Sequence, residues 1–364
     1  LSQYLNHAKQ PVVLAGAGIN HSKSNALLTE FVTHHQIPVV TTLLGLGAIP
    51  YENPLFLGMG GMHGSYASNM ALTECDLLIN LGSRFDDRLA SNPKEFVPNA
   101  KVVHIDIDES EINKVIPTTL GIVADCKKVL EALVTEHQSH ATYKEWVDHC
   151  LDNKSKHPFK YKEANDTFCR PQEAIEYIGK ITNGEAIITT DVGQHQMWSA
   201  QFYPFKHHSQ WVTSGGLGTM GFGIPSAIGA QLAAPDKTVI CFVGDGGFQM
   251  TNQEMALLPE YHLNVKIVLI NNGTLGMVKQ WQDKFFNQRF SHSVFNDQPD
   301  FIKMAEAYGV KSFLIDHPNK LKAQLDEAFN YEGPALIEVR ISPAEPVNPM
   351  IPSGKANHEM EGLE

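Results

Sequence analysis

Short apolar runs alternate with helix-length segments along the whole chain, and this alternation limits the folds that the sequence can adopt. Runs such as PVVLAG (11–16) and VKIVLINN (265–272) are apolar throughout, as strands buried on both faces of a parallel sheet are. Helix signals such as SNALLTEFVTHHQ (24–36) lie between them. The predicted strands are 11–16, 37–42, 76–82, 101–108, 121–125, 185–193, 237–246, 265–272 and 334–341. The pattern predicts an α/β fold with two doubly wound parallel sheets.

Residues 139–170 interrupt this alternation. They are polar and charged and contain no strand-like run, so we expect a helix followed by a linker. A length of 364 residues also suits two domains better than one. The predicted organisation is a first domain at 1–140, a linker at 141–170, a second domain at 171–342 and a Pro-rich tail at 343–364.

Composition excludes several classes of partner. A formal net charge of −12 argues against nucleic acid, because phosphate binding requires a basic face. No apolar run reaches the roughly 18 residues of a spanning helix, and the opening LSQYLNHAKQ does not resemble a signal peptide. The five cysteines include no CxxC pair, which suits reduced thiols. We expect a cytoplasmic protein without a membrane or nucleic-acid partner.

The stretch VGDGGF (243–248) places a lone acid, Asp245, at the end of a predicted strand, and the next strand ends at Asn272. If the two strands are neighbours, both side chains emerge at the edge where open parallel sheets bind ligands. Carboxylate and carboxamide oxygens suit Mg²⁺. Glycines let the backbone approach a phosphate closely; here they are Gly244, Gly246 and Gly247. Each half alone is a common turn, but the pair predicts an anchor for a metal and a diphosphate.

The GDG and NN motifs, with 26 residues between Asp245 and Asn272, resemble those of thiamine-diphosphate enzymes. The resemblance implies that these two side chains and the backbone carbonyl of Thr274 bind Mg²⁺. It also implies thiamine diphosphate contacts from VGQHQMW (192–198), from the glycine-rich loop SGGLGTMGFGIPSAIGA (214–230) and from the two motifs. The implied cofactor contacts are Gln194, His195, Gly218, Met220, Gly244, Gly246, Gly247, Leu275 and Gly276.

The first half narrows the resemblance to one family. The stretches LGMGGMHGSYASNMAL (57–72) and LGSRFDDR (81–88), with HIDIDESEINKV (104–115) and GMVKQWQ (276–282), are similar to the acetohydroxyacid synthases. The resemblance implies a bound FAD that is inherited as a structural group and takes no part in redox turnover. The implied FAD contacts are Gly16, Ala17, Gly18, Thr42, Leu43, Met62, His63, Gly64, Gly82, Ser83, Arg84, Asp106, Ile107, Asp108 and Asp125.

The same resemblance implies the catalytic residues and the reaction. Arg88, beside Asp87, would clamp the carboxylate of a 2-oxo acid. Trp281, near Met277, would favour 2-oxobutyrate over a second pyruvate by about 1–3 kcal/mol, the usual value of one methylene. The reaction is the decarboxylating condensation of pyruvate with a second 2-oxo acid in branched-chain amino acid biosynthesis. The family also implies a homodimer or homotetramer and allows for a small regulatory subunit.

One part of the family pattern is missing. Family members carry an N-terminal pyrimidine-binding domain whose glutamate activates the cofactor, whereas residues 1–10 contain no acid. We therefore expect the chain alone to bind cofactor weakly and to have little carboligase activity. The alternatives are a pyruvate oxidase, a glyoxylate carboligase, an FAD-independent acetolactate synthase, or a noncatalytic cofactor-binding module. A nicotinamide dehydrogenase fits less well, because no GxGxxG opens the first unit.

Overall fold

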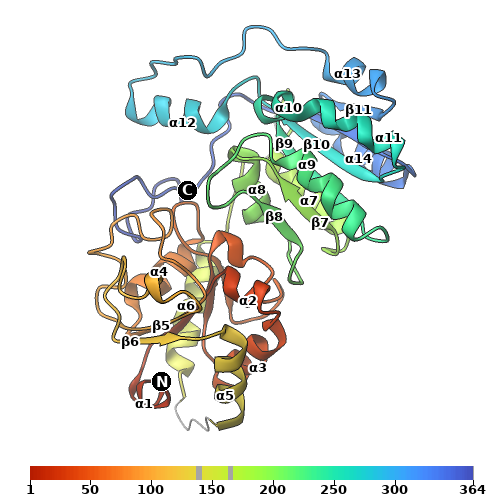
Figure 1. The fold of residues 1–364 in the computed structure, drawn as a ribbon. Coiled ribbons are helices and arrows are strands. Elements are labelled where there is room, and N and C mark those ends of the chain that lie inside the picture. The colour runs from red at the N-terminus through yellow and green to blue at the C-terminus, as the bar shows by residue number, and fades with distance from the viewer. Residues whose placement is uncertain (137–141, 163–166, 364) are drawn as a thin grey trace. The chain divides into compact units, whose positions relative to one another are not determined.

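The computed structural model describes residues 1–136, 142–162 and 167–363. The chain forms two compact units (Figure 1). The first comprises Leu1–Lys160, Phe205–Ser209 and Asn348–Glu364, and the second comprises Tyr161–Pro204 and Gln210–Val347. The predicted boundary between residues 140 and 141, and residues 163–166 of the predicted linker, lie outside the described residues.

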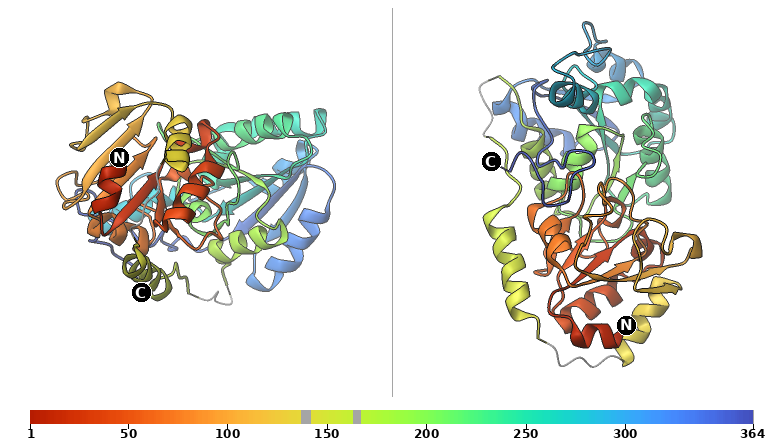
Figure 2. Two further views of the ribbon diagram at one scale, coloured as in Figure 1. Left: turned by 90° about the horizontal axis from the view of Figure 1, so that it is seen from below. Right: turned by 90° about the vertical axis from the view of Figure 1, so that its left-hand side faces the viewer.

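The first unit is built on a six-stranded parallel sheet with the order β3-β2-β1-β4-β5-β6. Its strands are β1 (Pro11–Ala15), β2 (Val39–Thr41), β3 (Phe56–Met59), β4 (Leu77–Leu81), β5 (Lys101–Asp106) and β6 (Leu120–Val123). Its helices are α1 (Ser2–His7), α2 (Ala17–His21), α3 (Asn25–His35), η1 (Leu43–Gly45), α4 (Tyr66–Glu74), η2 (Glu109–Glu111), α5 (Cys126–Glu136) and α6 (Lys144–Lys156). Helices α3 and α5 pack together on one face of this sheet, and α4 and α6 on the other (Figure 2).

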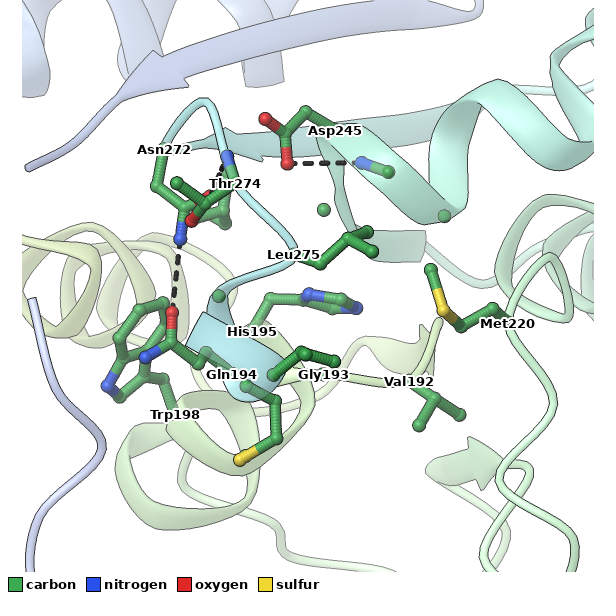
Figure 3. A pocket seen from close by; sticks show the side chains of 17 residues that line it. Val192, Gly193, Gln194, His195, Trp198, Met220, Asp245, Asn272, Thr274 and Leu275 are labelled. Atoms are coloured by element: carbon green, nitrogen blue, oxygen red, sulfur yellow. Dashed lines mark hydrogen bonds between the residues drawn. The ribbon is translucent and has the colours of Figure 1, made fainter. Parts of the chain in front are cut away.

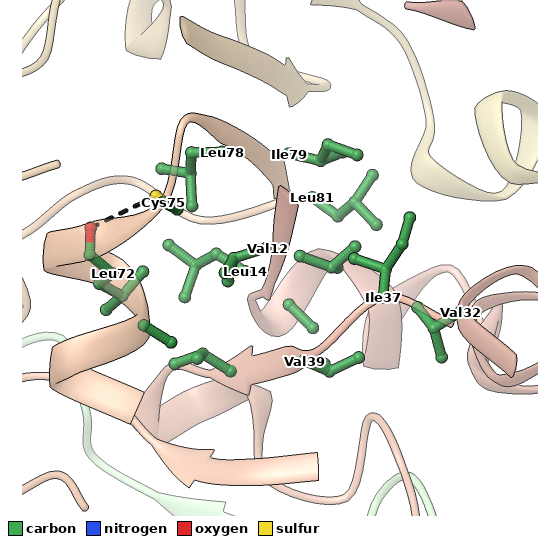
Figure 4. Close-up of a cluster of buried hydrophobic side chains, with 14 of the residues drawn as sticks. Val12, Leu14, Val32, Ile37, Val39, Leu72, Cys75, Leu78, Ile79 and Leu81 are labelled. Carbon is green, nitrogen blue, oxygen red and sulfur yellow. Dashed lines mark hydrogen bonds between the residues drawn. The ribbon is translucent and has the colours of Figure 1, made fainter. Parts of the chain in front are cut away.

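The core of the first unit surrounds β1 and β4, in which every residue is buried. Val12, Leu14 and Ile79 are among the side chains in Figure 4 that pack against residues of the covering helices. Burial of each such side chain stabilises the fold by about 1.5–3 kcal/mol. Helix α6 belongs to the same unit, since Trp146 Nε1 donates to the carbonyl of Pro11 at 3.0 Å.

The C-terminal tail also packs on the first unit. The backbone N–H of Ile351 donates to the carbonyl of Met62 at 2.8 Å, and Nδ2 of Asn357 donates to the carbonyl of Leu89 at 3.2 Å. Asn357 also reaches Oδ1 of Asn69, at 3.3 Å. These contacts hold the tail against the loops that follow β3 and β4.

The second unit is a six-stranded parallel sheet with the order β11-β12-β10-β9-β7-β8. Its strands are β7 (Ile187–Thr190), β8 (Trp211–Thr213), β9 (Val239–Gly244), β10 (Val265–Asn271), β11 (Lys311–Ile315) and β12 (Ala335–Arg340). Its helices are α7 (Pro171–Ile181), α8 (Gln194–Phe202), α9 (Gly223–Ala233), α10 (Asp245–Thr251), η3 (Asn252–Ala256), α11 (Leu257–Glu260), α12 (Gly276–Phe285), α13 (Phe301–Ala307), η4 (Pro318–Lys320) and α14 (Leu321–Asn330). Apolar residues of α9, α10 and α13 pack on one face of this sheet.

The two predicted doubly wound sheets are therefore confirmed, with three strands that the sequence did not predict. These are β3, β8 and β11, and each forms an edge of its sheet. The predicted pairing of the strands that end at Asp245 and Asn272 is also confirmed, since Gly244 of β9 is opposite Ile270 of β10. Within the described ranges, no helix combines the length and apolar character that crossing a membrane requires.

Candidate functional site

In the second unit the strand order reverses between β7 and β9. From β7 the chain moves outward to β8, and from β9 it moves the opposite way to β10. Ligands of open parallel sheets bind at such a point, beyond the carboxyl ends of the strands. Three adjacent strands end here with polar residues, namely Asp191 after β7, Asp245 after β9 and Asn272 after β10. A pocket lined by Asp245 and Asn272 lies at this edge (Figure 3).

Most of the residues predicted to bind thiamine diphosphate and Mg²⁺ line this pocket. Of these the lining contains Gln194, His195, Met220, Gly244, Asp245, Gly246, Gly247, Asn272, Thr274, Leu275 and Gly276, and it also contains Met277, which was predicted to be catalytic. Val192, Gly193, Trp198, Ile270 and Val278 complete it. Of the residues predicted in the second unit, Gly218 (cofactor) and Trp281 (catalytic) are not in the lining. Gly218 lies in the loop before Met220, with a φ of +62° that favours glycine, and Trp281 lies one turn beyond Met277 on α12.

Asp245 is the first residue of α10 and is buried. Its Oδ2 accepts a hydrogen bond from Nε2 of Gln298 at 2.6 Å, and its Oδ1 accepts one from the N–H of Gly246 at 3.0 Å. Burial raises the pKa of this carboxyl to about 6, and the hydrogen bonds oppose the shift only in part. No positively charged neighbour contributes to the shift among the described residues. A buried carboxylate that has no positively charged neighbour is a good ligand for a cation.

The carboxamide of Asn272 is held by hydrogen bonds at both ends. Its Oδ1 accepts from the N–H and from Oγ1 of Thr274, both at 3.0 Å. Its Nδ2 donates to Oε1 of Gln194 at 3.0 Å, as the dashed line in Figure 3 shows. These contacts turn the oxygen toward the loop of Thr274 and the nitrogen toward α8. Asn272 and Thr274 thus reach the same pocket as Asp245.

His195 directs an unused ring nitrogen into the buried part of the site. Its Nε2 is buried and has no hydrogen-bond partner among the described residues. Burial lowers the pKa of the ring to about 4, although the charge and the backbone of Asp191 oppose this shift. The neutral ring can accept a hydrogen bond at Nε2, and a protonated ring could donate one there. A phosphate oxygen accepts hydrogen bonds, so it pairs with the form of the ring that carries a proton on Nε2.

Glycines form the walls where the backbone approaches these groups most closely. A Cβ added to Gly276 would lie 1.9 Å from Oε1 of Gln194, and one on Gly244 would lie 2.8 Å from Nδ1 of His195. A Cβ on Gly247 would lie 2.6 Å from Cγ of Asp191. Larger residues at these positions would therefore displace the polar side chains of the pocket.

Three polar residues of this site were not predicted. Asp191 is fully buried and accepts hydrogen bonds from the N–H groups of Val192, at 2.7 Å, and Gly221, at 2.9 Å. The signal for it was present, because TTDVG repeats the strand-end acid seen at Asp245. Gln298 lies in an irregular segment with no comparable signal. Gln280 lies within GMVKQWQ, and this motif does not indicate that the side chain of Gln280 points into the protein.

Among the described residues, no group of three or more His, Cys, Asp or Glu side chains is arranged to hold a metal. The predicted magnesium ligands are one carboxylate, one carboxamide and one backbone carbonyl, so this result does not bear on them. The donor set fits a hard cation that takes its other ligands from phosphate and water. The buried acid, the unpartnered imidazole nitrogen and the glycine walls fit a diphosphate beside it.

In the first unit, the six predicted FAD segments follow the carboxyl ends of the six strands. The segments are 16–18 after β1, 42–43 after β2, 62–64 after β3, 82–84 after β4, 106–108 starting at the last residue of β5, and residue 125 after β6. The strand order reverses between β1 and β4. There the turns touch backbone to backbone, since a Cβ on Gly16 would lie 2.1 Å from the carbonyl oxygen of Gly82. Open parallel sheets bind ligands at the edge where their strand order reverses.

The acids of this edge shape its loops. Oδ1 of Asp106 accepts the N–H of Asp108 at 3.0 Å, and Oδ1 of Asp125 accepts the N–H of Lys127 at 2.7 Å. Ile107 lies between the first two acids and is 75% exposed. An exposed isoleucine among acids offers an apolar contact to a flat group such as an adenine ring.

Arg88 and Asp87 lie in an exposed loop of the first unit, whereas the pocket is formed by the second. Nη1 of Arg88 is 3.6 Å from Oδ2 of Asp87, with side chains that are 63% and 81% exposed. A pair of this kind contributes little to stability. The guanidinium therefore keeps donors available for another carboxylate.

Two family models match the chain. The model described as "Thiamine pyrophosphate enzyme, central domain" matches residues 1–133, and "Thiamine pyrophosphate enzyme, C-terminal TPP binding domain" matches residues 191–339. The second match contains all the residues that line the pocket.

Curated relatives match over nearly the whole chain. The acetolactate synthase large subunit of Lactococcus lactis is 54% identical over 359 residues, which is 99% of this chain and 62% of the relative. The isozyme 1 large subunit of Escherichia coli is 44% identical over 98% of this chain and 63% of its own length. The isozyme 2 large subunit is 40% identical over 98% of this chain and 64% of its own. The chain thus spans less than two thirds of these relatives' length. It belongs to the thiamine pyrophosphate enzymes, and its homologues include the large subunits of acetolactate synthase.

Proposed function

We propose that the chain carries the thiamine diphosphate and Mg²⁺ site of an acetolactate synthase. This transferase condenses pyruvate with pyruvate or 2-oxobutyrate, with loss of CO₂, in branched-chain amino acid biosynthesis. The observation that carries the proposal is the convergence of Asp245, Asn272 and Thr274 at the ends of two paired strands, in one pocket. The homology to large subunits supports the choice of reaction.

In this proposal Asp245 and Asn272 bind the cation through their side-chain oxygens, and Thr274 adds its backbone carbonyl. Asp245 supplies negative charge to the divalent ion. The fraction of Asp245 that is still protonated loses its proton when the ion binds. Gly244, Gly246 and Gly247 leave room for the diphosphate beside the ion. His195 and Gln194 flank the diphosphate from the start of α8.

The neighbouring residues orient the organic part of the cofactor. Thiamine diphosphate, when bound, supplies the electron sink that decarboxylation of a 2-oxo acid requires. Met220 and Leu275 form apolar surfaces next to Gly246, where they can hold the cofactor and exclude water. Gly218 allows the left-handed turn that brings Met220 to the pocket.

Arg88 is proposed to clamp the substrate carboxylate, with Asp87 limiting the orientations of the guanidinium. Two parallel N–H donors match a carboxylate in a way that lysine cannot. Met277 and Trp281, one turn apart on α12, are proposed to contact the substrate side chain and to favour 2-oxobutyrate. FAD is proposed to lie along the edge of the first sheet, on segments 16–18, 42–43, 62–64, 82–84 and 106–108 and Asp125.

The assembly and location are part of the same proposal. A homodimer or homotetramer with a small regulatory subunit, located in the cytoplasm, suits a homologue of proteins that are named large subunits. The predicted two-domain division at 1–140 and 171–342, with a linker between them and a tail after them, describes the parts that bind FAD and thiamine diphosphate.

The test is a paired measurement of binding and turnover on the protein and on Asp245→Asn. Isothermal titration with thiamine diphosphate is expected to show Mg²⁺-dependent binding that the variant loses. Pyruvate is expected to yield acetolactate with the parent protein and none with Asp245→Asn. Oxidation of pyruvate by a dye, or carboligation of glyoxylate, in place of acetolactate formation would contradict the proposed reaction. Binding without any turnover would favour a noncatalytic module.

A further inference from the structure

A chain of hydrogen bonds between carboxamides leads from the candidate metal ligand Asn272 to the main chain of residues 345–347. Nδ2 of Asn272 donates to Oε1 of Gln194 at 3.0 Å, and Nε2 of Gln194 donates to Oε1 of Gln280 at 2.8 Å. Gln280 then pairs with Val347 in both directions. Its Oε1 accepts the N–H of Val347 at 2.9 Å, and its Nε2 donates to the carbonyl of Val347 at 3.1 Å.

The main chain determines the direction of every bond in this network. A side-chain amide can exchange its oxygen and nitrogen by a half turn, but a backbone N–H only donates and a backbone carbonyl only accepts. The peptide groups of Val347 therefore fix the amide of Gln280. Nε2 of Gln194 also donates to the carbonyl of Glu345 at 3.0 Å, which fixes the amide of Gln194 in the same sense. The oxygen of Gln194 is then left for Nδ2 of Asn272.

We infer that Gln280 is a positioning residue that acts through Gln194 on the nitrogen of Asn272, while the N–H of Thr274 donates to the oxygen of Asn272 at 3.0 Å. Together they keep that oxygen turned toward the cation and the nitrogen turned away. The inference rests on the proposed function, because it requires Asn272 to be a metal ligand. A half turn of the Asn272 amide would present an N–H group to the ion, and an N–H group cannot ligate a cation. Groups that orient metal ligands in this way commonly contribute substantially to metal affinity.

Burial gives the network its rigidity. The side chains of Gln194, Gln280 and Asn272 are all buried, so water does not readily replace a lost partner. Gly276 packs directly under the first bond, because a Cβ there would lie 1.9 Å from Oε1 of Gln194 and 2.6 Å from Nδ2 of Asn272. The absence of a side chain at Gly276 thus permits the hydrogen bond between them.

The test removes the carboxamide of Gln280 without changing the pocket. Gln280→Met and Gln280→Leu keep the apolar volume of the side chain but cannot fix either amide. With Mn²⁺ as the probe cation and thiamine diphosphate present, electron paramagnetic resonance is expected to show affinity lower by about 10–100-fold in both variants. The matched control is Gln231→Leu, which removes another buried glutamine of the second unit whose partners are carbonyls of the turn at 234–237. The control is expected to bind Mn²⁺ like the parent protein.

A second background separates orientation from general loosening of the site. Asn272→Asp presents an oxygen to the ion in either orientation and requires no positioning. In that background, adding Gln280→Met is expected to change Mn²⁺ affinity by less than about threefold. The much larger loss that Gln280→Met causes when residue 272 is asparagine would then show that the two positions are strongly coupled. An equal loss of affinity in both backgrounds, or no loss in the first, would overturn the inference and leave the proposed function standing. Failure of the parent protein to bind Mn²⁺ with thiamine diphosphate would refute the proposed function and the inference together.

Discussion

Asp245 is the residue through which pH should control both stability and cation binding at the pocket. Its pKa rises from 3.8 to about 6 on folding, mainly through burial. Between these values the folded protein holds a proton that the unfolded chain has released, so this contribution to stability is lost as the pH rises toward 6 and above. His195 acts in the opposite sense, because its pKa falls from 6.5 to about 4. Its contribution is lost as the pH falls through that range.

The magnitudes follow from the shift. A change of roughly two pKa units corresponds to about 3 kcal/mol, which is the most that the ionised Asp245 costs the cation-free protein at pH 7. A cation must compete with the proton, so the ionised fraction of Asp245 sets its apparent affinity. That fraction falls from about 0.9 at pH 7 to about 0.1 at pH 5, and the affinity for Mg²⁺ with thiamine diphosphate should fall about tenfold.

The assay is urea unfolding between pH 4 and pH 7, on the protein and on Asp245→Asn, with and without Mg²⁺ and thiamine diphosphate. Taking the difference between the two proteins removes the contribution of His195. Without ligands, Asp245→Asn is expected to gain stability relative to the parent as the pH rises, by up to about 3 kcal/mol. When Mg²⁺ and thiamine diphosphate are added, only the parent protein should gain stability against urea. A difference that stays constant with pH would refute the argument that burial of this carboxyl creates the cation site.

Three other substitutions test separate parts of the structure. Gly276→Ala places a Cβ 1.9 Å from Oε1 of Gln194, and Mn²⁺ affinity should fall by about 10–100-fold; unchanged affinity would show that the contact is easily relieved. Leu14→Ala removes a fully buried side chain of β1 and should cost about 2–5 kcal/mol of unfolding free energy in urea; a loss below 1 kcal/mol would contradict the packing of the first core. Asn69→Ala removes hydrogen bonds to Gly61, at 2.8 and 3.0 Å, and to Asn357, at 3.3 Å. It should make the tail more sensitive to limited proteolysis, and equal cleavage of the two proteins would show that other contacts hold the tail.

The sequence predicted the interior of each sheet better than its edges. Central strands such as β1 and β10 are apolar throughout because helices cover both faces. The three strands that were not predicted lie at edges, where one side lacks a strand neighbour and burial is less complete. The β11 strand begins with exposed Lys311 and half-buried Ser312, and β8 has only three residues. Their sequences therefore carry little of the apolar signal that identifies a buried strand.

The site was predictable where a residue follows a strand directly, and less so elsewhere. Asp245 and Asn272 could be placed together because strand pairing alone brings their positions to one edge. Gln298 reaches Oδ2 of Asp245 from 53 residues away through an irregular segment, and such a path has no periodicity to read. The direction of Gln280 depends on how α12 rotates against the main chain near Val347, which only the tertiary packing determines.

The chain passes between the two units at four places, after residues 160, 204, 209 and 347. Dissection by simple truncation is therefore unsuitable for this protein. A recombinant fragment that stops at residue 160 would lack Met350 and Ile351, which are buried in the same unit, and would leave apolar surface uncovered. A circularly permuted or tethered design that restores residues 348–364 to the first 160 would be the better route to an autonomous first unit.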